Sequence, residues 1–177
     1  MLLDRFLEGA RSAGAATEKI NIYDCDIQYC QGCHLKCWVN NDTCPRWRDD
    51  MDMLHDRMLA SDLIVFSSPV YMGAPPAKLM AFFERSIDQK TVNLETLKVE
   101  NNKLSGKKAA VLQVNFFNDP AYQKLPMLVY ERILSEVFKM NIVGSLGVAD
   151  VREPGDIAKK KESLQEAYNL GAKLCAL

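Results

Sequence analysis

Cysteines are the residues of this sequence whose types and spacing best suit chemistry. Five of the six cysteines fall in one short segment, and the last four of these follow the pattern Cys-x2-Cys-x3-Cys-x6-Cys. Four thiolates this close in sequence can converge on one centre, and both iron–sulfur clusters and structural zinc are held by four such ligands. The spacing therefore predicts a metal site formed by Cys30, Cys33, Cys37 and Cys44.

Other states of the cysteine segment fit the same spacing. Cys30 and Cys33 form a Cys-x-x-Cys pair, which is also the spacing of a redox disulfide, and the thiols can equally stay free. His34 lies inside the segment and is a possible substitute ligand, although a solvated loop residue is the simpler interpretation. The remaining Cys25 and Cys175 are predicted to be ordinary buried thiols.

A second candidate site follows the most apolar strand of the sequence. Residues 63–67 are apolar on both faces, as strands of a parallel sheet are. The loop after them offers backbone amides, a flat apolar surface and a glycine that allows close approach, which suits the edge of a planar ring. The alternative is an ordinary strand-to-helix turn. We predict that this loop binds a cofactor through Ser68, Pro69, Val70, Tyr71, Met72 and Gly73.

A third segment, residues 115–120, follows another predicted strand. It places two phenylalanines between two asparagines, an arrangement that can flank a ring and bond its polar rim. The alternative is a capped loop whose phenylalanines belong to the core. Because ligands of open α/β sheets bind at the carboxyl ends of the strands, Asn115 and Phe116 are expected near the first loop.

The elements that position these loops alternate along the chain. Apolar periodicity predicts helices over 2–13 and 50–60, one starting at Pro75-Pro76, and two over 121–139 and 156–174. Strands are expected at 19–23, 63–67, 109–114 and 142–148, with a long loop at 25–48 and an irregular polar stretch at 89–106. This order predicts an α/β fold, a single domain over 1–177 with helices on both faces of a parallel sheet.

Composition and motif spacing exclude several classes of function. The net charge is -1 and 48% of residues are apolar, which argues against nucleic acid and against a membrane surface, so the cytoplasm is the default location. None of the five clustered cysteines has an arginine six positions later, as a low-molecular-weight phosphatase requires. The sequence has 2 histidines and no G-x-S-x-G motif, which disfavours a hydrolase triad. His55 is expected on the surface of its helix.

The run from Asp49 through Ser67-Ser68-Pro69-Val70-Tyr71-Met72-Gly73 to Arg85 resembles the NAD(P)H-dependent FMN reductases of flavodoxin-like fold. Among these it is most similar to the iron–sulfur flavoproteins. The resemblance implies FMN, with Pro69 to Gly73 against the isoalloxazine and the Asn115-Phe116 loop over another side. It also implies hydride transfer from NAD(P)H to the flavin, then delivery to a quinone, flavin or other acceptor, or single electrons to a [4Fe–4S] cluster. Relatives are commonly dimers or tetramers, so a homodimer or homotetramer is expected.

The sequence departs from that family at two places. The family begins with a strand and a glycine- and serine-rich phosphate loop, whereas this sequence starts at the helix that follows them, so we expect the sheet to lack its usual first strand. The usual cluster motif has two residues between the second and third cysteines, and this chain has three.

Two functions of other classes stay open at this point. The first is a non-enzymatic electron carrier, in which flavin and cluster shuttle electrons between proteins without direct oxidation of a nicotinamide. The second is a regulatory or metal-binding protein that uses the cysteine site and has no flavin.

Overall fold

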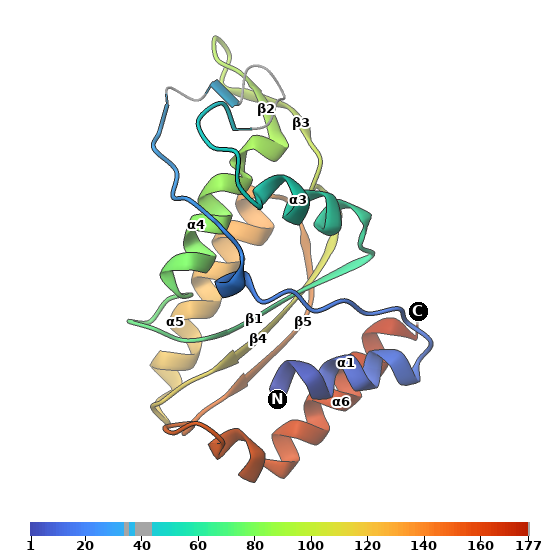
Figure 1. Cartoon of the computed structure of the whole chain (residues 1–177). Helices are drawn as coiled ribbons and strands as arrows, with labels where there is room; N and C mark the ends of the chain where they lie inside the picture. Colours follow the sequence, from blue (N-terminus) through green and yellow to red (C-terminus); the bar gives the residue numbers. More distant parts are fainter. Residues whose placement is uncertain (34–35, 38–43, 177) are drawn as a thin grey trace.

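A parallel three-stranded sheet forms the centre of the molecule, as a computed structural model shows for residues 1–33, 36, 37 and 44–176 (Figure 1). Its strands are β1 (Leu63–Pro69), β4 (Lys108–Val114) and β5 (Asn141–Val148), in the order β1-β4-β5. The register pairs Pro69 with Val114 and Val114 with Val148. All three carboxyl ends therefore meet at one edge of the sheet, so the loops that follow them emerge together.

Helices cover both faces of this sheet, and each face has its own apolar core. One core joins α3 (Met51–Ala60), α4 (Ala77–Arg85) and α5 (Pro120–Tyr130) with its π-helical continuation over Glu131–Val137. The other core joins α1 (Leu2–Ser12) and α6 (Lys161–Cys175). Side chains alternate between the two, since Val111 enters the first core and the next residue, Leu112, enters the second. The predicted doubly wound α/β architecture is confirmed.

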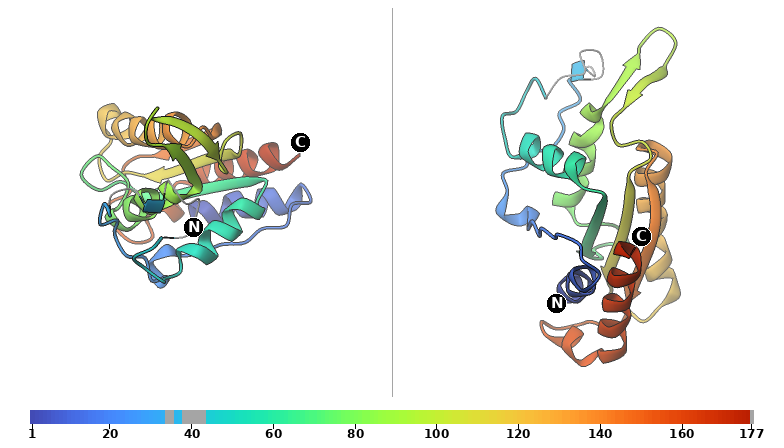
Figure 2. Two further views of the ribbon diagram at one scale, coloured as in Figure 1. Left: turned by 90° about the horizontal axis from the view of Figure 1, so that it is seen from above. Right: turned by 90° about the vertical axis from the view of Figure 1, so that its right-hand side faces the viewer.

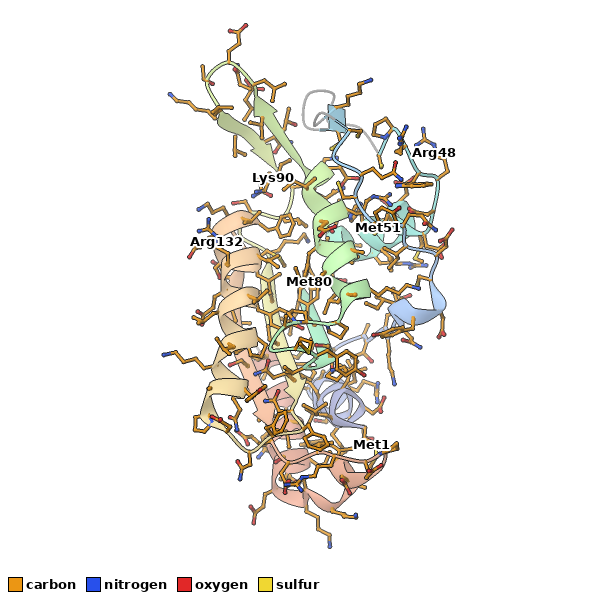
Figure 3. The ribbon with its side chains drawn as sticks, turned by 90° about the vertical axis from the view of Figure 1, so that its left-hand side faces the viewer. Met1, Arg48, Met51, Met80, Lys90 and Arg132 are labelled. Atoms are coloured by element: carbon orange, nitrogen blue, oxygen red, sulfur yellow. The ribbon has the colours of Figure 1, made fainter. Side chains whose placement is uncertain are left out.

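The interior beneath α3 and α4 is filled mainly by methionine and aromatic side chains. Met51 is fully buried, and Figure 3 shows it and Met80 among the side chains around these helices. Phe66, Phe82 and Phe83 pack with ring centroids 5.2–6.3 Å apart. These residues hold α4 against β1. Within the described residues, no helix is both long enough and apolar enough to cross a bilayer.

Two predictions of secondary structure are wrong. Residues 19–23 form no strand: the side chain of Asn21 accepts the backbone N–H of Tyr23, and this bond bends the chain into a 3₁₀ turn at Ile22–Asp24. No described strand pairs with the outer edge of β1, which agrees with the expected lack of a first strand.

The second wrong prediction concerns the polar stretch at 89–106, which forms an antiparallel hairpin instead of an irregular segment. Its strands are β2 (Lys90–Asn93) and β3 (Lys98–Asn102), and the hairpin projects beyond the sheet (Figure 2). Lys90 anchors its base with Nζ 5.3 Å from the centroid of the Phe138 ring (Figure 3). Both strands are short and mostly polar and β3 is almost wholly exposed, so the stretch has no apolar alternation that would predict a strand.

Helices α1 and α6 pack so closely that only glycine fits at two positions. A Cβ added to Gly9 would overlap the backbone carbonyl of Tyr168, and a Cβ added to Gly171 would overlap that of Phe6. This contact fixes the carboxyl-terminal helix against the sheet.

We expect Gly9→Ala to destabilise the protein by at least about 1 kcal/mol, because overpacking typically costs about 1–3 kcal/mol. In an exposed helix the same change would add up to about 1 kcal/mol of stability through helix propensity. Urea unfolding followed by circular dichroism measures the difference. Glu166→Ala, on the exposed side of α6, is the control and should stay within about 0.5 kcal/mol of wild type. A stabilised Gly9→Ala protein would contradict the close contact.

Candidate functional site

The loop after β1 is a tight reverse turn that presents two apolar side chains to solvent. Tyr71 and Ala74 exchange both backbone hydrogen bonds, with N–O distances of 3.0 and 2.9 Å. Between them, Met72 and Gly73 have positive φ angles of 52° and 74°, the pattern of a type I′ turn. Met72 is completely exposed and Tyr71 is 58% exposed. The predicted cofactor-binding loop is therefore preformed, with its apolar residues outward.

The start of this loop is tied to the sheet and to α5. The N–H of Val70 donates to the carbonyl of Val114 at 2.9 Å, which extends the pairing of β1 past Pro69. The hydroxyl of Ser68 bonds that of Tyr130 at 2.9 Å. Burial raises the pKa of Tyr130 to about 12, so its phenol stays neutral. In this structure Ser68 and Val70 hold the turn in place, and Tyr71 to Gly73 form its outer surface.

Asn115 is a buried amide whose side chain lacks a hydrogen-bond partner in the part of the chain that the structure describes. Its backbone is fixed by an N–H bond to Val148 (2.8 Å) and by a bond from Val151 to its carbonyl (3.0 Å). Its side chain is 2% exposed, and neither Oδ1 nor Nδ2 has a partner among the described residues. Buried amides are nearly always hydrogen-bonded, so this side chain is a candidate contact for a polar ligand.

The phenylalanines of the same loop lie on the surface and not in the core, so the alternative of two core phenylalanines is wrong. Phe116 and Phe117 are each about half exposed, and their ring centroids lie 5.0 Å apart. Phe117 also stacks with Tyr122 at 4.6 Å, and the guanidinium of Arg152 lies 5.6 Å from the Phe116 ring. Exposed aromatic surface thus lies directly beside the buried amide of Asn115.

Gln113 is a polar residue of this edge that sequence reasoning missed. It is 2% exposed, its Nε2 donates to the carbonyl of Gln123 at 2.8 Å, and its Oε1 has no partner in the described part of the chain. A glutamine in an otherwise apolar strand was the signal that could have found it.

A single pocket brings together the four cysteines predicted as metal ligands. Their side chains line it together with residues from α4 and the 3₁₀ turn after it, notably Arg85 and Asp88; the cysteines are Cys30, Cys33, Cys37 and Cys44. All six cysteines are free thiols, and Cys25 and Cys175 are half-buried, not buried as predicted. Burial, with smaller contributions led by Asp88, raises the pKa of Cys37 to about 11. As the side chains stand, no three His, Cys, Asp or Glu residues in the described ranges are arranged to hold a metal ion.

The flanks of this pocket are only partly described. Trp47 lines it and donates its indole N–H to the carbonyl of Tyr29 at 3.2 Å. His34 and Trp38 lie outside the described residues.

A buried ion pair between Arg85 and Asp49 links both ends of the cysteine segment to α4. Arg85 and Asp49 are 3% and 2% exposed, and their two hydrogen bonds measure 2.6 and 3.0 Å. Arg85 also donates to the carbonyl of Gln28 at 3.0 Å, and Asp49 accepts the N–H of Gln28 at 3.1 Å. Burial works to raise the pKa of Asp49, but the bonds from Arg85 and Gln28 hold it below its ordinary value. Burial works to lower the pKa of Arg85, but Asp49 and, to a smaller extent, Cys44 hold it above its ordinary value.

His55 is buried, so its expected surface position is wrong. Its side chain is 4% exposed and its Nδ1 accepts from Gln89 Nε2 at 3.0 Å. Ser86 donates its only hydroxyl proton to the carbonyl of Phe82, so the 3.1 Å contact of His55 Nε2 with Ser86 requires a proton on that nitrogen. Burial lowers the pKa of His55 to about 4, which keeps the ring neutral.

The signal for burial was present in the sequence, because His55 lies four residues after Met51 on the apolar stripe of α3. His55, Ser86 and Asp88 form a trio of residue types found in catalytic triads, and Asp88 lies 3.6 Å from His55. Ser86, however, is 1% exposed and its hydroxyl is bonded to the backbone, so it is no nucleophile.

Comparisons with known proteins agree with this fold. Residues 1–170 match the Flavodoxin_2 family model, described as a flavodoxin-like fold. An iron–sulfur flavoprotein of Methanosarcina thermophila is 29% identical over 174 residues, which cover 96% of this chain and 82% of that protein.

Solved structures show the same architecture. An NAD(P)H:quinone oxidoreductase from Methanothermobacter marburgensis superposes with a TM-score of 0.68 at 20% identity, covering 98% of this chain and 86% of that one. An FMN-dependent NADH-azoreductase from Bacillus anthracis, solved in complex with FMN, gives 0.69 at 14% identity, covering 98% and 90%. Because the family model spans nearly the whole chain, this protein belongs to the Flavodoxin_2 family and has its flavodoxin-like fold.

Proposed function

We propose that this protein is an FMN-dependent oxidoreductase that passes reducing equivalents from NAD(P)H through the flavin to a quinone, a flavin or another acceptor. The observation that carries the proposal is the unpartnered amide of Asn115, buried at the carboxyl edge of a flavodoxin-like sheet. The names of the Methanosarcina, Methanothermobacter and Bacillus proteins support the same chemistry.

The residues at this edge fit FMN. The amide of Asn115 offers one acceptor and two donors, which matches the alternating carbonyl and N–H groups on the rim of an isoalloxazine. Tyr71, Met72 and Phe116 offer apolar surface for its faces, and burying that surface would exclude water from the ring. Bound flavin supplies hydride acceptance and one-electron release, while the protein orients it and shapes its surroundings.

We further propose that the cysteine pocket holds a [4Fe–4S] cluster. Two observations support this proposal. Four thiols line one pocket, namely those of Cys30, Cys33, Cys37 and Cys44, and two relatives are named iron–sulfur flavoproteins. Zinc is the alternative with the same ligands, but it has no redox chemistry to exchange with a flavin. Assembly as a homodimer or homotetramer stays a prediction.

Protein reconstituted with FMN is expected to oxidise NADPH or NADH when a quinone or free flavin is present. Loss of absorbance at the nicotinamide band under anaerobic conditions, with and without acceptor, measures this. Flavin bound without any nicotinamide oxidation would instead support the rival function of an electron carrier. No binding of flavin would contradict the proposal and would favour the alternative of a protein that uses the cysteine site without flavin.

Asn115→Ala should weaken FMN binding about tenfold or more, because hydrogen bonds in a buried site contribute about 0.5–1.5 kcal/mol each. Without FMN its stability should stay near or above that of wild type, since the change removes two unpartnered buried atoms. Flavin fluorescence quenching and thermal unfolding measure the two effects. Asn118→Ala, an exposed asparagine of the same loop, is the matched control and should bind FMN like wild type. Equal affinities for both variants would refute the role of Asn115.

Cys33→Ala should abolish iron binding and leave the flavin in place, because the two proposed sites are formed by different segments of the chain. Iron, zinc, acid-labile sulfide and flavin are measured on anaerobically purified protein, together with the visible spectrum. Cys175→Ala, which changes a cysteine outside the pocket, should keep both cofactors. Wild-type protein that carries flavin but no iron under these conditions would show that the cluster is absent.

A further inference from the structure

One N–H donor of Arg85 lacks a hydrogen-bond partner among the described residues, and the side chain lines the cysteine pocket. The guanidinium is 3% exposed and is one of the residues that line the pocket with the four cysteines. Its two terminal nitrogens bind Asp49, and one of them also binds the carbonyl of Gln28. The third nitrogen, Nε, is buried and has no partner among the residues that the structure describes. A buried N–H of a charged group is costly to leave unpaired, and the side chain that carries this one lines the pocket, so a ligand held by the cysteines is a possible acceptor for it.

The ion pair with Asp49 holds that donor still. A bidentate arginine–carboxylate contact fixes the plane of the guanidinium, so Nε cannot turn away without breaking two bonds. It also offsets the charge of Arg85, and two further carboxylates, Glu84 and Asp88, line the same pocket. What Arg85 adds to the pocket is therefore mainly a directed N–H group and only to a small extent net positive charge.

We propose that the Nε–H of Arg85 donates a hydrogen bond to a sulfur atom of the cysteine-bound cluster and that this bond raises the reduction potential of the cluster. This inference rests on the proposed function, specifically on a cluster held by the four cysteines. A thiolate-ligated cluster carries more negative charge after it accepts an electron, so a donor beside its sulfurs stabilises the reduced form more than the oxidised form. Hydrogen bonds to the sulfurs are among the factors that set such potentials.

Arg46 provides a comparison inside the same pocket. It also lines the pocket, but it is exposed and its Nε already donates to Gln31 Oε1 at 2.7 Å. The two arginines therefore have the same charge but differ in burial and in the availability of Nε.

The test compares three variants after anaerobic reconstitution. Arg85→Lys keeps a cation opposite Asp49 but removes Nε–H; Arg85→Gln combined with Asp49→Asn removes both charges at once; Arg46→Gln is the matched control. Iron, sulfide and flavin contents are measured first, then the cluster potential by redox titration with electron paramagnetic resonance. Both Arg85 variants should retain iron and show a more negative potential, with the reduced-to-oxidised ratio at fixed potential about tenfold lower, or about 59 mV for a one-electron couple. Arg46→Gln should leave the potential unchanged.

The possible failures are distinguishable. Iron present in wild type, with the same potential in both Arg85 variants as in the control, overturns the role of Arg85 and leaves the cluster intact. Loss of iron with retention of flavin in both Arg85 variants also overturns it, because the residue then only builds the loop. Absence of iron from wild type overturns the cluster itself, and the inference with it.

Discussion

The structure depends on β4, which pairs with β1 on one side and β5 on the other. Four consecutive residues of this strand, 109–112, are completely buried, so both faces of the sheet are closed at its centre. Parallel pairing in this register brings the ends of three strands together, and the Tyr71 turn and the Asn115 loop emerge side by side as a result. An edge of this kind is where open α/β sheets bind ligands.

A second constraint organises the cysteine segment. An ordered loop of this length loses much conformational entropy, and the described part of it has little regular structure to offset the loss. The pair of Arg85 and Asp49 joins residues near both ends of the loop to a helix that the phenylalanine core already holds. The cysteines thus face α4 because the ends of their segment are anchored there.

Satisfaction of buried polar groups separates structural sites from candidate binding sites in this molecule. The trio around His55 contains residue types that catalyse reactions elsewhere, yet both ring nitrogens have partners and the ring is neutral. Asn115 and the Nε of Arg85 are equally buried but lack partners in the described residues. Both ring nitrogens of His55 are satisfied by the protein itself, although Oε1 of its partner Gln89 lacks a partner among the described residues, whereas at Asn115 and Arg85 we propose that a ligand supplies the missing partner.

The sequence by itself determined the α/β class and the positions of the helices and of the three paired strands, and it indicated the cysteines and the loops after β1 and β4 as candidate sites, but not Gln113 or Arg85. These are local properties, because periodicity, turn residues and cysteine spacing act over a few neighbouring positions. Only the tertiary structure decided that β2 and β3 pair and that Phe116 is exposed. Likewise, only the tertiary structure brought Arg85 to the cysteine pocket, because Arg85 lies 41 positions after Cys44, the last cysteine of the motif. Each of these depends on which distant segment packs against a residue, and no local pattern carries that information.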